Sequence, residues 1–411
     1  MTYPACRFCG APLETSFADL GETPLANSYL PDNKNAIAAE RSYPLHAKVC
    51  GRCYLVQLDA AVPAAQIFDH DYAYFSSFSK GWLEHAKRYC TDMSKRFNLG
   101  EDSLVVEVAS NDGYLLRYFV EQNIPVLGIE PAGAAAKAAI ELGVPTRVHF
   151  FDETSAGELA QEGVRANLIA ANNVFAHVPD IRFFAAGFPK ILKPEGVVTF
   201  EFPHLLKQIE GFQFDTIYHE HYSYLSLLAV EKVLTVVGLR AFDVQELPTH
   251  GGSLRVFACH EEAAHEQTQG LTVVRTKETQ AGLDQLATYE RFSHNIAAIR
   301  EEFLAFLQRA KQQNASLAAY GAAAKGNTFL NYCGVTSKDI DFVVDRNPAK
   351  QHHLLPGSHI PIRTPEALAQ EKPDYVIILP WNLVDEIRSS MAHISDWGGQ
   401  FVTAVPKVKI W

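Results

Sequence analysis

The sequence predicts an α/β protein in which a small cysteine-rich N-terminal module precedes two Rossmann-like units. Two C-x-x-C pairs lie within the first 53 residues, and short apolar runs alternate with helical stretches between residues 104 and 202. A similar alternation begins again at residue 316. Apolar runs of this length with helices between them are typical of buried parallel strands. The expected parts are a metal-binding module, a first α/β domain, a helical connector and a second α/β domain, at residues 1–75, 76–260, 261–314 and 315–411.

The composition narrows the class of protein. Hydrophobic residues make up 47% and charged residues 20% of the 411 residues, which excludes a disordered, collagen-like or coiled-coil chain. The formal charge of −11, with no dense Lys/Arg run, argues against a nucleic-acid partner. No apolar stretch reaches the roughly 18 residues of a membrane span, so no membrane partner is expected. The N-terminal MTYPACRFCG lacks the apolar core of a signal peptide, and we therefore expect a cytoplasmic protein with reduced thiols.

The two C-x-x-C pairs, CRFC and CGRC, predict a zinc site formed by Cys6, Cys9, Cys50 and Cys53. In a reducing compartment such pairs bind metal more often than they form disulfides. Each pair turns two thiolates to one side, and two pairs complete a tetrahedral zinc shell with bonds of about 2.3 Å. Four thiolates leave no open coordination position, so this zinc is expected to stabilise structure. The remaining cysteines stand alone and are expected in the core: Cys90, Cys259 and Cys333.

The first α/β unit is expected to begin with an amphipathic helix over residues 81–97. Strands with helices between them are expected at residues 104–109, 126–130, 146–150, 167–172 and 197–202. Ser226 is placed to cap a helix that stops at Gly238, and two further strands, RAFDVQEL and SLRVFACH, follow it. Five alternating strands and a hairpin-like pair are the strand count of the Rossmann-like class I methyltransferase sheet, whose last strand is antiparallel.

The second α/β unit is expected to contain a helix at 322–334 and strands at residues 316–321, 340–345, 374–380 and 400–406. Its first turn, GAAAKG, has the spacing of the dinucleotide motif G-x-G-x-x-G, but Ala323 occupies the second glycine position. That methyl group hinders close approach of a pyrophosphate. Asp345 stands at the end of the next strand, where dinucleotide sites place a ribose-binding acid. An NAD(P)-dependent oxidoreductase therefore stays open as an alternative function.

The run EVASNDGYLL follows the first strand of the first unit and opens a helix. The first loop of a methyltransferase usually reads E-x-G-x-G-x-G; here Glu107 and Gly113 are kept, and Ala109 and Asn111 replace glycines. Small residues let the backbone approach a ligand, and the helix N-terminus offers free N–H donors. S-adenosylmethionine carries no phosphate and does not require the full glycine set. We therefore assign this cofactor to the loop, with Ser110 included.

Further cofactor contacts are expected where other strands of this sheet end. Glu130 ends the second strand, where an acidic side chain can accept hydrogen bonds from both ribose hydroxyls. A solvated strand end is the alternative for this residue. Asn172, Asn173 and His177 follow the fourth strand at the carboxyl edge, where ligands bind in such sheets. A purely structural role for His177 stays open.

The densest polar and aromatic stretch is FPHLLKQIEGFQFDTIYHEHYSYLS, at residues 202–226. Histidine exchanges protons near neutral pH, and a neighbouring carboxylate or phenol can tune or orient it. The H-E-H spacing does not match the i, i+4 spacing of zinc ligands on a helix. Beside a cofactor site, this stretch is interpreted as catalytic rather than as a polar loop over the sheet edge. Its polar and aromatic members are His204, Tyr218, His219, Glu220, His221, Tyr222 and Tyr224.

The order of the motifs carries a family resemblance. The following motifs occur along the chain in this order: CRFC, CGRC, EVASNDGYLL, NNVFAHVPD, IYHEHYSYLS, HGGSLRVF, AYGAAAKGNTFLNY and ILPWNL. The sequence resembles the sugar C-methyltransferases that modify nucleotide-linked 4-keto-deoxysugars, especially the carbon-3 enzymes of antibiotic sugar pathways, over nearly its whole length. The resemblance implies a zinc-binding domain, an S-adenosylmethionine-binding domain and a Rossmann-like C-terminal domain around one active site. It also implies a dTDP-linked 4-keto-deoxysugar as substrate and a monomer or weak homo-oligomer.

The resemblance further implies that His221 is the general base. Tyr218 and Glu220 stand beside it in the motif Y-x-E-H, and His177 lines the site. A 4-keto group acidifies the hydrogen on carbon 3, because the resulting carbanion delocalises onto oxygen. His221 would remove that proton, and donors from Tyr218, His177 or water would stabilise the enolate oxygen. The enolate carbon would then attack the sulfonium methyl group in line, without a metal.

Other roles are less tightly tied to a motif. Tyr72 is implied to line the site from DYAYFSS, where Tyr74 is an alternative and a packing role stays open. Lys325 in the C-terminal loop is assigned to the diphosphate of the substrate, the alternative being a solvated lysine. The further substrate-binding candidates are His204, Tyr222 and Asn382. An oxidoreductase acting on a nucleotide sugar and a non-catalytic zinc scaffold are the alternative functions.

Overall fold

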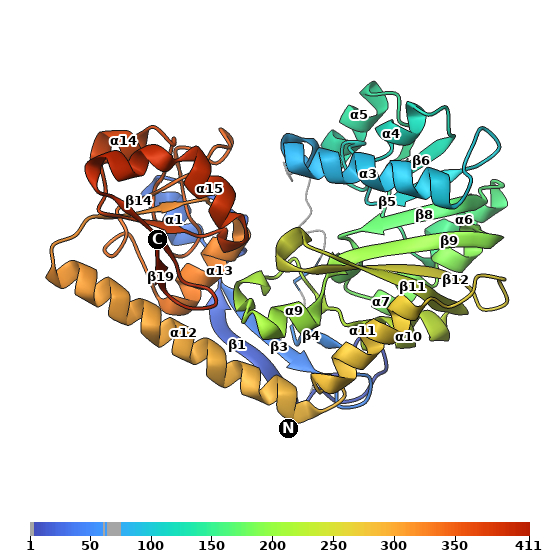
Figure 1. Cartoon of the computed structure of the whole chain (residues 1–411), viewed down its shortest axis with the longest axis horizontal. Helices are drawn as coiled ribbons and strands as arrows, with labels where there is room; N and C mark the ends of the chain where they lie inside the picture. Colours follow the sequence, from blue (N-terminus) through green and yellow to red (C-terminus); the bar gives the residue numbers. More distant parts are fainter. Residues whose placement is uncertain (1–3, 61, 64–74) are drawn as a thin grey trace.

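The computed structural model describes residues 4–60, 62–63 and 75–411. Figure 1 shows two α/β bodies, one on each side of a small N-terminal sheet, with a long helix, α12(Leu286–Gln312), running beneath the C-terminal body and the N-terminal sheet. Within the described residues, the strands form sheets of four, seven, six and two strands. None of the helices in these residues combines the length and apolar character needed to cross a membrane.

The four-stranded sheet belongs mainly to the N-terminal module. Its order is β1(Thr15–Thr23), β3(Tyr43–Val49), β4(Val56–Leu58) and β10(Ser223–Tyr224), with antiparallel neighbours. The edge strand β10 comes from the polar and aromatic segment at residues 202–226, far along the chain. A second link between distant segments is the antiparallel pair of β2(Leu30–Pro31) and β15(His353–Leu354). Helix α1(Lys34–Ala39) follows β2, and its first turn is capped by the Asn33 side chain.

The seven-stranded sheet has the architecture that the sequence predicts for the first α/β unit. Its spatial order is β11(Leu239–Leu247), β12(Ser253–His260), β9(Leu192–Pro203), β8(Ala166–Asn172), β5(Val105–Val108), β6(Val126–Ile129) and β7(Thr146–Arg147). All neighbours are parallel except at β12, which runs antiparallel to both β9 and β11. Strand β7 is shorter than predicted. It lies at the edge of the sheet, and the following Val148 and Phe150 are about half exposed, at 55% and 50%.

Helices cover both faces of this sheet, and each face has its own hydrophobic core. The predicted cap of α10(Leu227–Val236) is present, because the Ser226 hydroxyl accepts a hydrogen bond from the backbone N–H of Ala229 at 3.1 Å. Ser79 caps the first helix of the unit in the same way. The other α-helices of this unit are α3(Lys80–Arg96), α4(Arg117–Val120), α5(Gly133–Glu141), α6(Glu153–Gln161), α7(Ile181–Ala185), α8(Phe188–Ile191) and α9(Leu205–Glu210).

The six-stranded sheet forms the C-terminal α/β body. Its order is β16(Ile362–Arg363), β14(Phe342–Val344), β13(Leu317–Tyr320), β17(Tyr375–Ile378), β18(Gln400–Thr403) and β19(Lys409–Ile410), parallel except at β19. Its α-helices are α13(Ala324–Cys333), α14(Ala367–Glu371) and α15(Val384–Ser390). The two-residue strands β16 and β19 were not predicted, because they are too short to show a periodic pattern.

Two helices connect the α/β bodies and also support them. These are α11(Gln269–Gln280) and α12(Leu286–Gln312). On α12, Phe292 stacks on Phe17 of β1 with ring centroids 4.4 Å apart, and Phe303 contacts Phe329 of α13 at 4.7 Å. One hydrophobic core therefore joins the N-terminal sheet, α12, the C-terminal body and the buried residues of segment 214–224. This shared core fixes the place of the segment that was predicted to be catalytic.

Candidate active site

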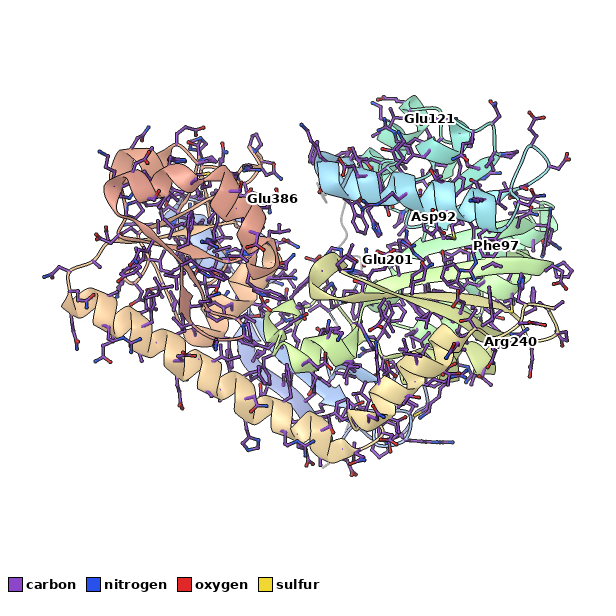
Figure 2. The ribbon with its side chains drawn as sticks, viewed as in Figure 1. Asp92, Phe97, Glu121, Glu201, Arg240 and Glu386 are labelled. Atoms are coloured by element: carbon purple, nitrogen blue, oxygen red, sulfur yellow. The ribbon has the colours of Figure 1, made fainter. Side chains whose placement is uncertain are left out.

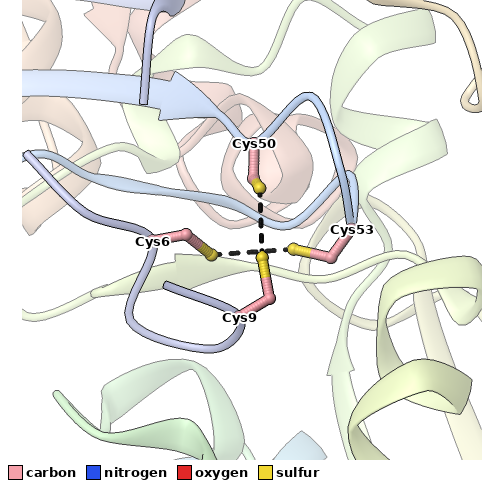
Figure 3. A group of neighbouring side chains, drawn as sticks. All are labelled: Cys6, Cys9, Cys50 and Cys53. Atoms are coloured by element: carbon pink, nitrogen blue, oxygen red, sulfur yellow. Dashed lines mark hydrogen bonds between the residues drawn. The ribbon is translucent and has the colours of Figure 1, made fainter. Parts of the chain in front are cut away.

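Four cysteines from the two C-x-x-C pairs converge at one end of the N-terminal sheet (Figure 3). Their sulfur atoms all lie within 4.8 Å of one another, with Cys6–Cys53 at 3.6 Å and Cys9–Cys50 at 3.5 Å. A disulfide needs a bond of about 2.05 Å, whereas zinc bonds of about 2.3 Å place tetrahedral sulfurs about 3.8 Å apart. The Gln57 amide also donates to the Cys6 sulfur at 3.1 Å, as an outer partner of a thiolate ligand does. The four residues fit a structural zinc ion.

The loop after β5 keeps the backbone path of a glycine-rich cofactor loop although two glycines are replaced. Ala109, Asn111 and Gly113 have φ angles of 58°, 49° and 75°. All three values lie in the left-handed region, which asparagine tolerates and which alanine adopts only at a cost. The backbone N–H of Ser76, just before α3, donates to the Asn111 side chain at 2.9 Å. Residues ahead of α3 thus close over the loop.

Glu130 lies immediately after β6 and supports this loop directly. Its two carboxylate oxygens accept backbone N–H groups from Asn111 and Ala132, each at 2.8 Å. The side chain is 5% exposed, so it is a buried group rather than a solvated strand end. Burial raises the pKa of Glu130, and the two N–H bonds oppose that shift. Each oxygen retains a further acceptor position with which a ribose hydroxyl can bond.

The neighbouring strand ends carry buried polar atoms that a ligand could pair with. The side-chain oxygens of Ser110, Asn172 and Asn173 are buried and have no hydrogen-bond partner among the residues that the structure describes. Buried polar atoms are usually paired, so this edge of the sheet suits a polar cofactor. Burial also raises the pKa of Glu107, inside β5, well above its usual range. The chemistry of these residues fits S-adenosylmethionine.

His221 lies between β9 and α10, in the turn before β10. Its Nδ1 atom is 2.8 Å from the carbonyl oxygen of Thr216. A carbonyl only accepts, so Nδ1 carries the proton and Nε2 keeps its lone pair in the neutral ring. The pKa of His221 is well below its usual value, chiefly because of burial. Coupling to the ionisable His177 ring and the positive charge of Lys325 lower it further, and the bond to Thr216 opposes the shift. The ring is therefore neutral, with one basic nitrogen, at neutral pH.

Two of the predicted partners contact the His221 ring. The Tyr218 ring is tilted by 35° with its centroid 4.0 Å away, and the His177 ring lies at 4.7 Å in an edge-on arrangement. His177 belongs to a short 3-10 turn after β8, and burial lowers its pKa to about 4. Glu220 is oriented toward the N-terminal module, where its carboxylate accepts a hydrogen bond from the Asn27 amide. The structure thus groups His177, Tyr218 and His221 at the carboxyl edge of the cofactor sheet.

The substrate-binding candidates divide into two pairs. The Lys325 ammonium lies 3.5 Å from the Asn382 side-chain oxygen. The positive charge of Lys325 also helps to lower the pKa of His221. His204 instead pairs with buried Glu278 at 2.7 Å, and Glu278 caps the N-terminus of α10. Tyr222 is fully buried, and its hydroxyl donates to the Val62 carbonyl. Lys325 and Asn382 thus form one pair, whereas the side chains of His204 and Tyr222 are directed to other partners.

Tyr72 and its alternative Tyr74 lie outside the described residues. Their implied place in the site stays a prediction. The described chain resumes at Phe75 and passes beside the cofactor loop, where the backbone of Ser77 donates to Asp112 at 3.2 Å.

Comparison with known proteins decides the family. Family models match residues 6–68 as a zinc binding domain, 82–244 as a methyltransferase domain and 248–406 as a C-methyltransferase C-terminal domain. C-methyltransferase NovU of Streptomyces niveus is 33% identical over 405 residues, covering 98% of this chain and 96% of NovU. The chain belongs to the sugar C-methyltransferase family. It is an S-adenosylmethionine-dependent C-methyltransferase with a structural zinc site, which replaces the oxidoreductase and scaffold alternatives.

Two of the solved structures that are similar to this C-methyltransferase match about half of its chain. Magnesium protoporphyrin IX methyltransferase of Synechocystis is 14% identical, with a TM-score of 0.37, over 49% of this chain and 99% of that one. The 1,6-didemethyltoxoflavin-N1-methyltransferase of Burkholderia thailandensis is 16% identical, with a TM-score of 0.37, over 50% of this chain and 94% of that one.

The glycine-like loop of the C-terminal body is held by the acid at the end of the next strand. The Asp345 carboxylate accepts the backbone N–H groups of Ala322 and Asn347, each at 2.8 Å. The Lys350 ammonium donates to the Ala322 carbonyl at 2.8 Å. Asp345 thus holds its own loop in the way that Glu130 holds the loop after β5. The family assignment, rather than these bonds, sets the dinucleotide alternative aside.

Two residues near the base were missed by sequence reasoning. Asp215 is fully buried, and its carboxylate accepts a hydrogen bond from the Trp381 indole at 2.6 Å. Burial raises the pKa of Asp215 to about 6, and the Lys325 charge and the indole bond oppose that rise. The sequence signal was weak, because Asp215 and Trp381 are 166 residues apart and only the fold joins them.

A third missed residue is His250, in the turn between β11 and β12. It has a φ angle of 56° and is followed by two glycines, also with positive φ. Burial lowers the pKa of His250 to about 4, and coupling to this ionisable ring makes a small contribution to the lowered pKa of His221. The turn rests on a buried ionic network at Glu201, labelled in Figure 2, which bonds to His85 at 2.8 Å and to Arg255 at 2.6 Å. His250 lies in the run PTHGG, which separates the two predicted strands RAFDVQEL and SLRVFACH, and nothing in that run marked it as part of the site.

Proposed function

We propose that this C-methyltransferase methylates carbon 3 of a dTDP-linked 4-keto-deoxysugar, with His221 as the general base. The observation that carries the proposal is the tautomer of His221. Its Nδ1–H is held by the Thr216 carbonyl, so a basic Nε2 remains in a neutral ring beside Tyr218 and His177. The family relationship supports a nucleotide sugar as the substrate class.

The chain's own residues account for the proton-transfer half of the reaction. The 4-keto group makes the carbon-3 hydrogen acidic, and His221 Nε2 takes that proton. On this proposal, Tyr218 and His177, whose rings contact the His221 ring, donate to the oxygen on which negative charge develops. When bound, S-adenosylmethionine supplies the methyl group. The bond at one nitrogen keeps the His221 ring aligned, and the protein around the ring excludes water. Alignment and exclusion of water are the main requirements of the step.

Substrate binding also prepares the base. The positive charge of Lys325 helps to lower the pKa of His221. A diphosphate bound by Lys325 and Asn382 compensates that charge, so the pKa of His221 rises when the nucleotide sugar is in place. The base becomes stronger as its substrate arrives. On this proposal, the cation at residue 325 both binds the diphosphate and regulates His221.

The cofactor is proposed to lie against the loop of residues 109–113, with its ribose on Glu130. Asn172, Asn173, Ser110 and Glu107 provide the surrounding polar groups. The zinc-bearing module, the cofactor sheet and the C-terminal body then meet at the His221 cluster, in line with the proposed divisions near residues 75, 260 and 314. We place this enzyme in the cytoplasm, where the four zinc-binding thiols stay reduced.

The test is a substrate panel. Purified enzyme is incubated with S-adenosylmethionine carrying a labelled methyl group and with nucleotide sugars that have or lack a 4-keto group. The expected product is a 4-keto sugar heavier by one methylene unit, with the label on carbon 3 by NMR. A label on carbon 5, or methylation of sugars without the keto group, would contradict the proposal.

A further inference from the structure

One side chain of the zinc knuckle reaches the catalytic segment. Arg7 lies between the zinc ligands Cys6 and Cys9. Its guanidinium donates from one nitrogen to the Leu58 carbonyl and from the other to the Tyr222 carbonyl. Leu58 ends β4, and Tyr222 immediately precedes β10, so the fork of the arginine joins two adjacent strands from opposite halves of the chain.

The Tyr222 carbonyl is held from two directions. It accepts the Arg7 guanidinium and also the backbone N–H of Leu58 at 3.1 Å. The Arg7 backbone N–H in turn donates to the Gln57 side chain at 2.9 Å, and the amide of Gln57 donates to the Cys6 sulfur. The zinc ligand, the arginine and the strand pair form one continuous hydrogen-bonded unit.

His221 is the next residue before this clamped carbonyl. On its other side, its backbone N–H donates to the Tyr218 carbonyl at 2.9 Å, and its ring is bonded to Thr216. The turn that holds the ring is therefore anchored at its end by Arg7. A shift of the Tyr222 carbonyl moves the His221 backbone with it. Misplacement of a reacting group by about 1 Å can reduce turnover by about a hundredfold.

Packing alone does not explain the Arg7 guanidinium, because burying a cation costs free energy. Arg7 is half-buried, and both bonding nitrogens contact backbone carbonyls rather than a carboxylate. Burial lowers the pKa of Arg7, and the negative charges of Cys6 and Asp59 oppose that shift. The planar, two-sided guanidinium can bond both carbonyls at once, which a lysine ammonium on its flexible stem does less precisely. We propose that Arg7 is a positioning residue that transmits the rigidity of the zinc knuckle to His221. This inference rests on the proposed role of His221 as base.

Lys232 provides a matched control. It lies on α10, and its ammonium donates to the carbonyl of the zinc ligand Cys53 at 3.3 Å and covers the Tyr54 ring at 4.7 Å. Lys232 is thus a second cation that links the zinc module to the cofactor domain, but not through β10. Its removal shows whether the loss of any such link between the two parts reduces turnover.

The experiment compares R7A, R7K and K232A in the full-length zinc-loaded protein. R7A is expected to keep one zinc per chain and its affinity for S-adenosylmethionine, and to lose turnover by about ten- to a hundredfold. Added guanidinium chloride at low concentration should restore part of that loss, and R7K should retain an intermediate rate. K232A should resemble the wild type. Turnover of R7A within twofold of the wild type, or loss of zinc in proportion to turnover, would overturn the proposal.

A spectroscopic readout separates this inference from the role of the base. In protein with ¹⁵N-labelled histidine, the ring signal of His221, assigned by its loss in H221N, should move in R7A and return with guanidinium. If that signal moves but H221N still exchanges the carbon-3 proton, the positioning contact stands and the proposed base is wrong. If the signal is unchanged in R7A, Arg7 does not position His221, whatever residue is the base.

Discussion

Replacing His221 by asparagine tests the proposed chemistry most directly. An asparagine amide can still donate to the Thr216 carbonyl that holds Nδ1 at 2.8 Å, so the turn before β10 should keep its shape. The substitution removes the basic Nε2, and general-base catalysis is typically worth about 10²–10⁴-fold. We expect kcat to fall by that factor while affinity for S-adenosylmethionine is unchanged, because Glu130 and the loop after β5 lie on other strands.

The assay for His221→Asn is exchange of the carbon-3 proton rather than turnover alone. Enzyme, a nucleotide 4-keto sugar and S-adenosylhomocysteine are mixed in heavy water, and deuterium at carbon 3 is measured by NMR or mass spectrometry. An enzyme-free sample is subtracted, because 4-keto sugars exchange spontaneously. The matched control is His219→Asn, since His219 is also buried and bonded to a carbonyl, that of Pro44 at 3.2 Å. This control should exchange at the wild-type rate.

The pH dependence follows from the lowered pKa of His221. The neutral ring is the active form, so the wild-type rate should be flat through neutral pH. It should fall only on the acid side, below the usual histidine value of about 6.5. The residual activity of His221→Asn should lack this acid limb. If the variant matches wild type in exchange and methyl transfer, the reasoning is refuted, and His177 and then Glu220 become the candidates.

Three other substitutions test the surrounding parts. Cys50→Ser should release zinc, by elemental analysis, and lower kcat through β10 while calorimetry shows cofactor affinity intact; a zinc-free wild type would refute the zinc site. Glu130→Ala should weaken S-adenosylmethionine binding by about 1–3 kcal/mol, the scale of a lost charged acceptor, and unchanged affinity would leave Glu130 a purely structural role. Lys325→Met should raise KM for the nucleotide sugar and, by removing a nearby positive charge, raise the pKa of His221, so the acid limb moves to higher pH. If the acid limb does not move, the charge of Lys325 does not influence the pKa of His221.

The sequence predicted the parts of the fold that bury continuous apolar runs. Strands such as β5 and β8 are buried along nearly their whole length, so their composition alone marks them. The edge strand β7 was predicted too long, because apolar residues beyond Arg147 are exposed. Strand β10 has two residues and no pattern, yet it is the strand that attaches the catalytic segment to the zinc module. Pairing between distant short segments leaves no periodic signal.

The candidate site was predictable where spacing fixes geometry. Two C-x-x-C pairs identify a four-cysteine cluster whatever lies between them. By contrast, His204 and His221 belong to the same polar stretch and cannot be separated by composition. They differ in their hydrogen-bond partners. His204 is bonded to the buried carboxylate of Glu278, whereas His221 is bonded to a backbone carbonyl through one nitrogen and keeps the other nitrogen basic. Asp215 was overlooked because its partner Trp381 belongs to another body of the molecule.

The position of the base explains why one reaction involves three modules. The cofactor sheet contributes His177 from its edge, but His221 lies on the connection between β9 and α10, outside the sheet. Two supports of that connection come from other modules: Trp381 of the C-terminal body bonds Asp215, and Arg7 of the zinc module bonds Tyr222. A site is accurate only if its supporting residues are rigid. If His221 is the base, the Rossmann-like sheet provides the cofactor site and the flanking modules hold the proposed base in register with it.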